Sequence, residues 1–389
     1  MIRLFSLLSV LSYLTAFSQE DDLNKYVSGK TTGSLPFLEF GLGDDRLGGA
    51  KMTYLDTGIV MKVVDSTIIN YKVQLSKNHF AYLPKGNFLK DSSVKSKPYY
   101  LSNSWVVNGD NKYDYVIVTL DEKLPYRSFQ QINPSRIIID IFGATSNTNW
   151  ITQKSSAKEI RNSYYEQTED DVFRVIIELN HPQHWGYSIY YNNKRLVIKI
   201  KRQPARLKIK NLKIAIDAGH GGSNSGARGI TSKIQEKNYN LLFAKQLEKS
   251  LLKEKATVFM TRHTDTSLSM LERTDMLRKE DPDFMISIHL NSSVRDSIRG
   301  VSTYYRYIGF RPLTQHILKS MLSLGLNEFG NVGGFNFSLN GPTDYPNCLV
   351  EVAFLSNKED EKLILDPAFH KETAYRILKG IKSWLKSCQ

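Results

Sequence analysis

Hydrophobic and polar positions alternate along most of the first 200 residues, in short runs that are typical of β-strands. Apolar runs at residues 59–64, 71–75 and 80–83 are separated by polar breaks. These runs predict short strands that belong to a small β-barrel. We place this barrel in a first domain that covers residues 21–96.

The next stretch, residues 103–202, repeats its own pattern at a fixed spacing. VIVTL (116–120) corresponds to VIIEL (175–179), and SRIIIDI (135–141) corresponds to KRLVIKI (194–200), in both cases 59 residues later. All four segments alternate with period 2 and are rich in β-branched residues, which favours strands. We therefore predict a second domain, a β-sandwich made of two similar sheets packed face to face.

In residues 207–389, strand-like runs alternate with helical periodicity. Strands are expected at 212–217, 256–261, 283–288, 300–305 and 348–354. One amphipathic helix carries Leu241, Ala244, Leu247 and Leu251 on one face, and the last helix carries Ala374, Ile377, Ile381, Trp384 and Leu385. This alternation predicts an α/β domain with a central, largely parallel sheet that is covered on both faces. Ligands in such folds bind beyond the carboxyl ends of the strands.

Composition and the first residues constrain the class of protein. A chain of 389 residues with 41% hydrophobic content fits two or three folded domains and excludes a disordered chain. Residues 1–18, MIRLFSLLSVLSYLTAFS, predict a cleaved export signal, and the alternative is an uncleaved anchor. No other run reaches about 18 apolar residues, so we expect no membrane span in the mature protein. Cys348 and Cys388 could pair after export, but their spacing does not require it.

The net charge is +13, of which residues 201–389 carry +10. A basic domain favours an anionic polymer as partner, and for an exported protein this indicates the cell wall rather than nucleic acid. Part of this charge lies in the linker KIKRQPARLKIK, so the charge only supports the other observations.

Four residues of the third domain carry candidate chemistry. His220 follows IDAG and precedes two glycines, and His289 ends the apolar run FMISI. Glu236 lies at the first turn of a predicted helix, 16 residues after His220. Glu351 interrupts the apolar strand CLVEVAFL, where an unpaired buried carboxylate would be costly. Two histidines and a glutamate that meet at one sheet edge form a zinc site with a free position for water.

Each of these residues also has a purely structural explanation. A histidine in a tight turn can simply bind the backbone, and an acidic residue at the start of a helix fits the helix dipole. His289 could be a core histidine with satisfied hydrogen bonds, and Glu351 could pair with an arginine. The expected convergence of all four on one sheet edge favours the metal site.

Five ordered motifs make residues 212–385 similar to the zinc-dependent N-acetylmuramoyl-L-alanine amidases of the amidase_3 type. The motifs are KIAIDAGHGG, QEKNYNL, MTRHTD followed by LERTDMLR, FMISIHLNSS and LVEVAFLSN. The resemblance implies that His220, Glu236 and His289 bind Zn²⁺ and that Glu351 is the catalytic carboxylate. It also implies hydrolysis of the amide bond between N-acetylmuramic acid and L-alanine, by a water whose pKa zinc lowers towards about 7.

Further residues match the pattern of this family. They are Asp217, Asn240, Arg262 and Arg273, which we expect to support the site or the packing around it. Some amidases of this kind insert a self-blocking helix between the second histidine and the catalytic glutamate. Here that interval of 62 residues is largely filled by a predicted strand, a helix around residues 313–324 and a stretch rich in Gly and Asn. We therefore expect an open site.

The two amino-terminal domains carry weaker resemblances. The first is similar to a bacterial SH3-like domain, and the second is similar to the AMIN domain of exported amidases, which implies wall binding and a place in the periplasm or cell envelope. The implied partner is peptidoglycan, and an envelope activator or a division protein remains an option. Two other functions stay open: a catalytically silent wall-binding or septal scaffold of the same fold, and a zinc peptidase that cuts between amino acids.

Overall fold

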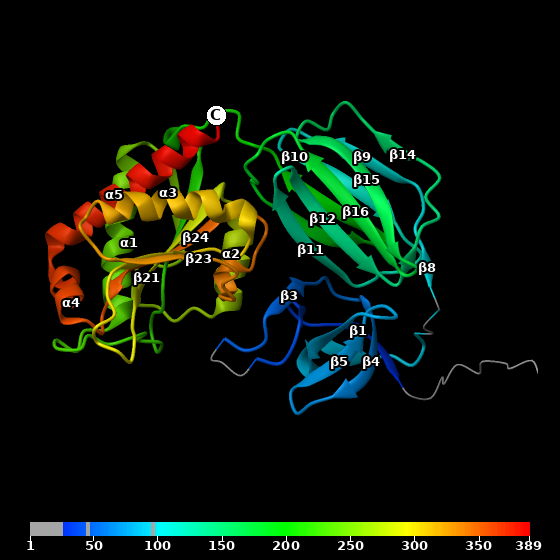
Figure 1. Cartoon of the computed structure of the whole chain (residues 1–389), viewed down its shortest axis with the longest axis horizontal. Coiled ribbons are helices and arrows are strands. Elements are labelled where there is room, and N and C mark those ends of the chain that lie inside the picture. The colour runs from blue at the N-terminus through cyan, green and yellow to red at the C-terminus, as the bar shows by residue number, and fades with distance from the viewer. Residues whose placement is uncertain (1–25, 44–46, 95–96, 98) are drawn as a thin grey trace, which may run out of the picture.

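The computed structural model describes residues 26–43, 47–94, 97 and 99–389, which form three domains (Figure 1). The first is blue, the second cyan to green, and the third runs from green to red. The predicted export signal at residues 1–18 lies outside the described residues. Within the described part of the chain, we find no helix that combines the length and the apolar character needed to cross a membrane.

The first domain is one antiparallel sheet in the order β3-β2-β6-β5-β4-β1-β7. Its strands are β1 (Val27–Thr31), β2 (Phe37–Glu39), β3 (Lys51–Tyr54), β4 (Val60–Ser66), β5 (Asn70–Gln74), β6 (Phe80–Pro84) and β7 (Phe88–Lys90), with the 3-10 turn η1 (Lys85–Asn87) before β7. The three predicted strands are confirmed as β4, β5 and β6. In β4, buried Met61 and Val63 alternate with more exposed neighbours, because successive side chains of a strand point to opposite faces.

The second domain contains the predicted pair of sheets, which contribute to one hydrophobic core. One sheet has the order β14-β9-β10-β18-β17 and the other β11-β12-β16-β15. The strands are β8 (Tyr100–Leu101), β9 (Trp105–Gly109), β10 (Tyr113–Thr119), β11 (Tyr126–Ile132), β12 (Ser135–Phe142), β13 (Ala144–Thr145), β14 (Ile151–Gln153), β15 (Ile160–Glu169), β16 (Val172–Leu179), β17 (Tyr187–Asn192) and β18 (Arg195–Lys201). The repeat governs the pairing: β10 pairs with β18 and β12 with β16, so strands of one copy pair with strands of the other.

The third domain is built on a six-stranded sheet in the order β20-β19-β21-β24-β22-β23. Its strands are β19 (Lys213–Ala218), β20 (Thr257–Met260), β21 (Phe284–Asn291), β22 (Val301–Tyr304), β23 (Glu328–Val332) and β24 (Asn347–Phe354). The prediction of a largely parallel sheet needs correction, because the sheet is mixed: β22 runs antiparallel to β24, and β23 runs parallel to β22. Hydrophobic periodicity indicates which face of a strand is buried and carries no information on strand direction.

Helices cover both faces of this sheet. They are α1 (Glu236–Lys253), α2 (Met270–Glu280), α3 (Arg311–Leu322), α4 (Lys358–Leu365) and α5 (Pro367–Ser387), with 3-10 turns η2 (Ile209–Asn211), η3 (Ile308–Phe310) and η4 (Ser338–Asn340). α1, α3 and α5 pack together over one face, where Ile286 and Ile288 of β21 are buried. Met285 is buried on the other face, beneath α2 and η4. The alternation along β21 therefore directs Ser287 and His289 to the α2 face.

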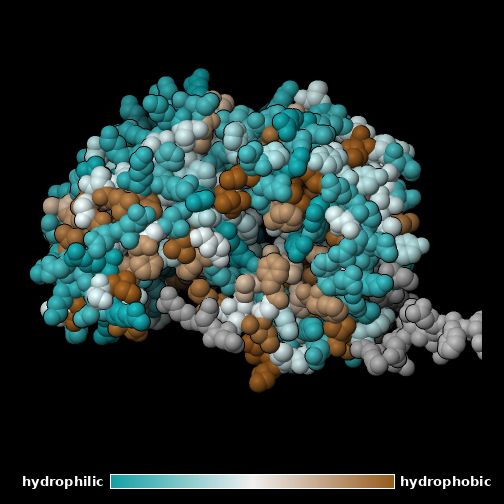
Figure 2. Space-filling model, in the orientation of Figure 1, coloured by the Kyte–Doolittle hydropathy of each residue, from teal (hydrophilic) through white to brown (hydrophobic). Residues whose placement is uncertain are grey.

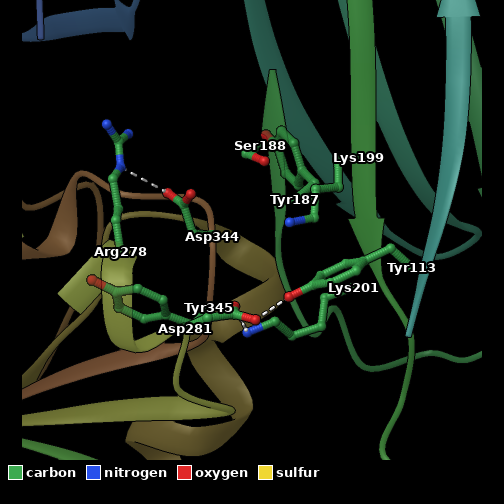
Figure 3. A pocket seen from close by; sticks show the side chains of 9 residues that line it. All are labelled: Tyr113, Tyr187, Ser188, Lys199, Lys201, Arg278, Asp281, Asp344 and Tyr345. Carbon is green, nitrogen blue, oxygen red and sulfur yellow. Dashed lines mark hydrogen bonds and ion pairs between the residues drawn. The ribbon is translucent and has the colours of Figure 1, made fainter. Parts of the chain in front are cut away.

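The three domains are in direct contact. A single hydrophobic core runs through the first and second domains and includes Ile59 of the former and Val107 of the latter. The second and third domains meet at Asp281, which follows α2. The buried Lys201 ammonium lies 2.6 Å from the Asp281 carboxylate (Figure 3). Lys112 and the Tyr113 hydroxyl donate to the same carboxylate.

The surface and the cysteines add little to the chemistry. The face shown in Figure 2 is mostly hydrophilic, with hydrophobic residues in small scattered patches. Cys348 is buried in β24, Cys388 is half-buried at the end of α5, and both are free thiols. Packing and hydrogen bonds therefore hold the fold without a disulfide.

Candidate metal centre

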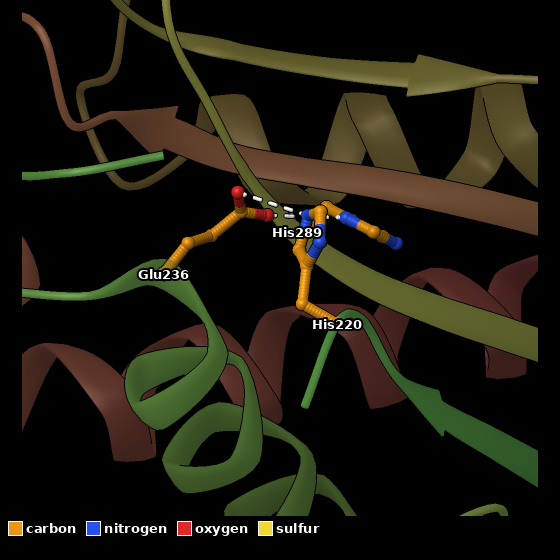
Figure 4. Close-up of side chains that lie close together, drawn as sticks. All are labelled: His220, Glu236 and His289. Atoms are coloured by element: carbon orange, nitrogen blue, oxygen red, sulfur yellow. Dashed lines mark hydrogen bonds and ion pairs between the residues drawn. The ribbon is translucent and has the colours of Figure 1, made fainter. Parts of the chain in front are cut away.

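Three side chains from separate elements meet at the carboxyl end of the central strands (Figure 4). His220 lies in the loop after β19, Glu236 is the first residue of α1, and His289 lies on β21. His220 Nε2 is 3.0 Å from Glu236 Oε2, and His289 Nδ1 is 3.1 Å from Glu236 Oε1. One potential ligand atom from each residue lies within 4.8 Å of the other two. The structure thus brings three of the four sequence-predicted residues together.

The donor atoms fit a divalent cation such as zinc. A tetrahedral zinc ion with bonds of about 2.0–2.2 Å holds its ligand atoms roughly 3.3 Å apart, close to the separations seen here. Burial raises the pKa of Glu236, but the adjacent imidazoles of His220 and His289 outweigh burial and hold this pKa well below its usual range. The carboxylate is therefore ionised at neutral pH, as a metal ligand must be.

Glu351 lies beside His289 on the neighbouring strand. The parallel register of β21 and β24 pairs the Cα of His289 with that of Glu351. Val350 and Val352 enter the core beneath α1 and α5, so Glu351 points to the α2 face, as His289 does. A register shift follows directly after this pair, between His289 and Asn291. Glu351, a half-buried residue, thus lies next to His289 without belonging to the group of three.

Hydrogen bonds fix the orientation of both His220 and Glu236. His220 Nδ1 lies 2.9 Å from Asn224 Oδ1, so Nδ1 carries a proton and Nε2 is left to face Glu236. The Glu236 carboxylate accepts hydrogen bonds from Asn240 Nδ2 at 3.0 Å and from the Ala227 backbone N–H at 2.8 Å. The side chains of His220 and Glu236 are therefore oriented before any ion binds.

Two buried arginines hold the backbone of the turn that carries His220. Arg273 donates to the Asp217 carboxylate and to the His220 carbonyl, both at 2.5 Å. Arg262 donates to the carbonyls of Ala218 and Gly219, both at 2.8 Å. These bonds stabilise a turn in which His220 has a φ of 59°, a left-handed conformation that is uncommon outside glycine.

The four residues that we expected to support the site do so. Asp217, Arg262 and Arg273 belong to the hydrogen-bond network of the turn, and Asn240 binds the carboxylate of Glu236. The pKa of Asp217 is consistent with its pairing to Arg273. Burial raises this pKa, but Arg273 and His289 outweigh burial and lower it. Asp217 is therefore an anion paired with Arg273.

Two glycines leave room for the cluster. A Cβ at Gly219 would lie 2.3 Å from Cε1 of the His289 ring, and a Cβ at Gly226 would lie 2.4 Å from Glu236 Oε2. No real side chain tolerates such distances, so the ring and the carboxylate can reach their places only because these positions lack a side chain.

Sequence analysis did not single out Asn224 or Phe337. The Phe337 ring lies 5.5 Å from the His289 ring, in an edge-to-face arrangement. The general need of a metal-binding histidine for a partner at its second nitrogen is a signal that could have indicated Asn224. Phe337 lies in the Gly- and Asn-rich stretch before β24, whose pattern gave no prediction.

The structure describes every residue between His289 and Glu351. It contains β22, η3, α3, β23 and η4, and no further helix is present within residues 290–350. The expectation of an open site remains a prediction, because it concerns the behaviour of the enzyme.

Two family models match the chain. Residues 214–383 match the N-acetylmuramoyl-L-alanine amidase model, Amidase_3, and residues 106–213 match the AMIN domain. A probable cell wall amidase of Staphylococcus epidermidis, LytH, is 33% identical over 180 residues, which are 46% of this chain and 60% of that relative. The chain thus spans less than two thirds of the length of this curated relative.

Solved structures of amidases are also similar to part of this chain. An N-acetylmuramoyl-L-alanine amidase from Clostridium difficile 630 is 30% identical, with a TM-score of 0.44, over 46% of this chain and 98% of that chain. The catalytic domain of CwlV from Bacillus (Paenibacillus) polymyxa var. colistinus is 33% identical, with a TM-score of 0.43, over 45% and 98%. The two family models confirm the amidase_3 resemblance for the third domain and the AMIN resemblance for the second.

Proposed function

We propose that this chain, which carries an amidase_3 domain behind an AMIN domain, is a zinc-dependent peptidoglycan amidase. Its substrate would be the amide bond between N-acetylmuramic acid and the L-alanine of the stem peptide, cut during cell separation or wall turnover. One observation carries this proposal: His220, Glu236 and His289 converge with metal-ligand spacing, and Glu351 lies in register beside them.

His220, Glu236 and His289 would hold the zinc ion, which when bound polarises a water and supplies positive charge for the developing oxyanion. Asn224 keeps the Nδ1 proton of His220 in place. Glu351 takes a proton from the attacking water and delivers it to the alanine nitrogen as the C–N bond breaks. The position of Glu351 next to His289 supports this role, because a proton carrier must reach both the water and the leaving amine.

For the amino-terminal half, we propose wall binding by an SH3-like first domain at residues 21–96 and an AMIN-like second domain at residues 103–202, with the catalytic domain at residues 207–389. The small antiparallel sheet of the first domain and the AMIN match of the second support this proposal. The export signal proposed at residues 1–18 would deliver the protein to the periplasm or cell envelope, where it meets peptidoglycan.

The test of the proposed reaction is digestion of purified peptidoglycan by residues 19–389, with products read by mass spectrometry. We expect free stem peptides that begin with an L-alanine amine, loss of these products with a chelator, and recovery with zinc. Peptides cut between amino acids would indicate a zinc peptidase instead. Intact wall with the protein bound to it would indicate a scaffold.

A single substitution tests the assigned proton carrier. Glu351→Gln keeps the size of the side chain and removes its ability to take a proton, so we expect product formation to fall by at least about 100-fold. The affinity for zinc should change little, because Glu351 is not among the three grouped residues. Full activity of this variant in wall digestion would contradict the proposed mechanism.

A further inference from the structure

Residues 333–346 connect β23 to β24, the strand that carries Glu351. This connection, which we call the shared segment, contacts all three domains. It contains Phe337, whose ring packs against His289, and it leads directly into the strand beside the candidate metal centre. Its position is therefore coupled to the geometry of the site.

Successive side chains of the shared segment point in opposite directions. The Phe335 ring lies 4.6 Å from Tyr304 of the catalytic sheet, and the Phe337 ring lies 5.5 Å from His289. Between them, the Asn336 amide reaches the first domain, where it donates to the Gly49 carbonyl at 2.8 Å. One face of this short extended stretch thus belongs to the site, and the other belongs to a different domain.

The contact with the first domain is extensive for a single side chain. Asn336 Nδ2 also donates to the Leu47 carbonyl at 3.3 Å, and Asn336 Oδ1 accepts from the Lys51 N–H at 3.3 Å. Arg306 of the catalytic domain strengthens this contact, because it donates to Asn336 Oδ1 at 3.2 Å and to the Lys51 carbonyl. The amide of Asn336 therefore binds a strand edge of the first domain.

Further along, the shared segment is held by both amino-terminal domains. A Cβ at Gly341 would lie 2.7 Å from the Tyr54 ring of the first domain, so the backbone passes directly against that ring. Thr343 exchanges two bonds with Tyr187 of the second domain: the Tyr187 N–H donates to the Thr343 carbonyl, and Thr343 Oγ1 donates to the Tyr187 carbonyl, both at 2.7 Å. The connection is thus fixed at both its middle and its end.

We propose that the shared segment is one wall of the catalytic site and that the amino-terminal domains hold it in place. In this arrangement, the half-buried Phe337 ring contacts the apolar part of the substrate next to the scissile amide, and Asn336 is a positioning residue that acts through Phe337. The inference rests on the proposed amidase function for the identity of the substrate. The holding of the wall itself does not depend on that function.

Substitutions in residues 19–389 test this proposal. Asn336→Ala removes the three bonds to the first domain, and Phe337→Leu keeps an apolar side chain while removing the ring. The matched control is Asn331→Ala, since Asn331 Nδ2 donates to Thr303 Oγ1 at 2.9 Å and to Thr314 Oγ1 at 2.7 Å, both inside the catalytic domain. Amide hydrogen exchange of residues 333–341, zinc affinity, KM and kcat are measured for each variant.

For Asn336→Ala, we expect exchange at residues 333–341 to accelerate about tenfold, because the lost bonds allow the segment to open. KM for peptidoglycan fragments should rise about five- to tenfold in both Asn336→Ala and Phe337→Leu, with a smaller change in kcat and unchanged zinc affinity. Asn331→Ala should leave the exchange of this segment and KM close to those of the unmodified protein.

Unchanged exchange in Asn336→Ala would overturn the claim that the first domain holds the wall. Unchanged KM in Phe337→Leu would overturn the substrate contact, even if Asn336→Ala folds poorly. If the unmodified protein releases no stem peptides, the proposed reaction fails, whereas the exchange measurement still decides whether the wall is held.

Discussion

At the scale of single residues, the candidate metal centre depends on side chains that would not touch the ion. Asn224 holds one nitrogen of His220 at 2.9 Å and so directs the other nitrogen to Glu236. Without this partner, the imidazole can rotate and take either tautomer, which reduces the population that is ready to bind a metal.

We predict that Asn224→Ala lowers the affinity for zinc by about 10- to 100-fold, as is typical when the partner of a metal-binding histidine is removed. Asn224→Asp retains an oxygen acceptor and should stay within about threefold of the unmodified protein. Competition with a chromophoric chelator measures both affinities. Asn238→Ala is the matched control, because Asn238 is an exposed asparagine near the start of α1, outside the loop that carries His220. Equal affinities for the Ala variants at 224 and 238 would contradict the role of Asn224.

Candidate site residues that lie at or near the end of a strand could be predicted from the sequence. His220 and His289 follow apolar runs, and Glu351 interrupts one, so their placement at one sheet edge could be predicted from period and polarity. Asn224 and Phe337 could not be found in this way. Their roles depend on a turn with a left-handed His220 and on a contact across a long connection, and neither leaves a periodic signal.

At the scale of elements, α2 stabilises the turn after β19 through Arg273. This side chain is completely buried and pairs with Asp217, which also accepts from Thr261 Oγ1 and Ser287 Oγ. Two strands and one helix are therefore joined at a single buried carboxylate, directly behind the loop that carries His220.

Arg273→Met should destabilise the third domain by about 3–5 kcal/mol, because it leaves the Asp217 charge buried without its cationic partner. Arg278→Met in the same helix should cost less than about 1 kcal/mol, since Arg278 is more exposed and its contact with Asp344 is 3.6 Å long. Urea unfolding measures both. Adding Asp217→Asn to Arg273→Met should recover part of the loss, and a further loss would contradict the explanation by an unpaired charge.

Helices and strands were predicted correctly where their buried apolar residues recur at a regular spacing along the sequence. The strands around residues 212–217, 283–288 and 348–354 and the apolar faces of α1 and α5 are confirmed. β23 was missed because the segment Glu328–Val332 is exposed to half-buried and contains a glycine, so it lacks the apolar alternation of a core strand. The antiparallel direction of β22 depends on how the chain returns after β21, which no local pattern specifies.

At the scale of the whole molecule, the charged Asp281 carboxylate of the third domain binds polar groups of the second domain. Burial raises the pKa of Asp281, but Lys201, Lys112 and Tyr113 outweigh burial and lower it to about 2, from an ordinary value of 3.8. Because the pKa in the folded protein is the lower one, the charge stabilises the fold fully above about pH 5. This stabilisation is lost as the pH falls from about 4 towards 2.

Asp281→Asn should therefore lower the free energy of unfolding by about 2 kcal/mol at pH 7, and the difference from the unmodified protein should shrink as the pH falls below about 4. Urea unfolding at pH 7, 5 and 3.5 measures this dependence. Asp275→Asn removes an exposed carboxylate from α2, the helix that Asp281 follows, and should have little effect at any of these pH values. A difference for Asp281→Asn that grows at low pH would contradict the sign of the predicted shift.

The succession of a β-rich amino-terminal half and an α/β domain was the most predictable feature at this scale, because the 59-residue repeat and the change from strand to helix periodicity mark this change of fold. The contacts between domains were not predictable. Lys201, Asp281 and Asn336 are polar residues at the ends of elements or in connections, and they resemble ordinary surface residues until the domains are placed together.

The docking of the three domains has a consequence for how such a protein would meet a long polymer. Only residues 202–212 separate β18 from β19, and the contacts at Asp281 restrict the movement of the third domain relative to the second. If the amino-terminal half binds a glycan strand as proposed, the effective concentration of scissile bonds at the candidate metal centre is high at one offset along the strand and close to zero elsewhere. Cleavage would then occur at a fixed distance from the point at which the amino-terminal half binds the strand.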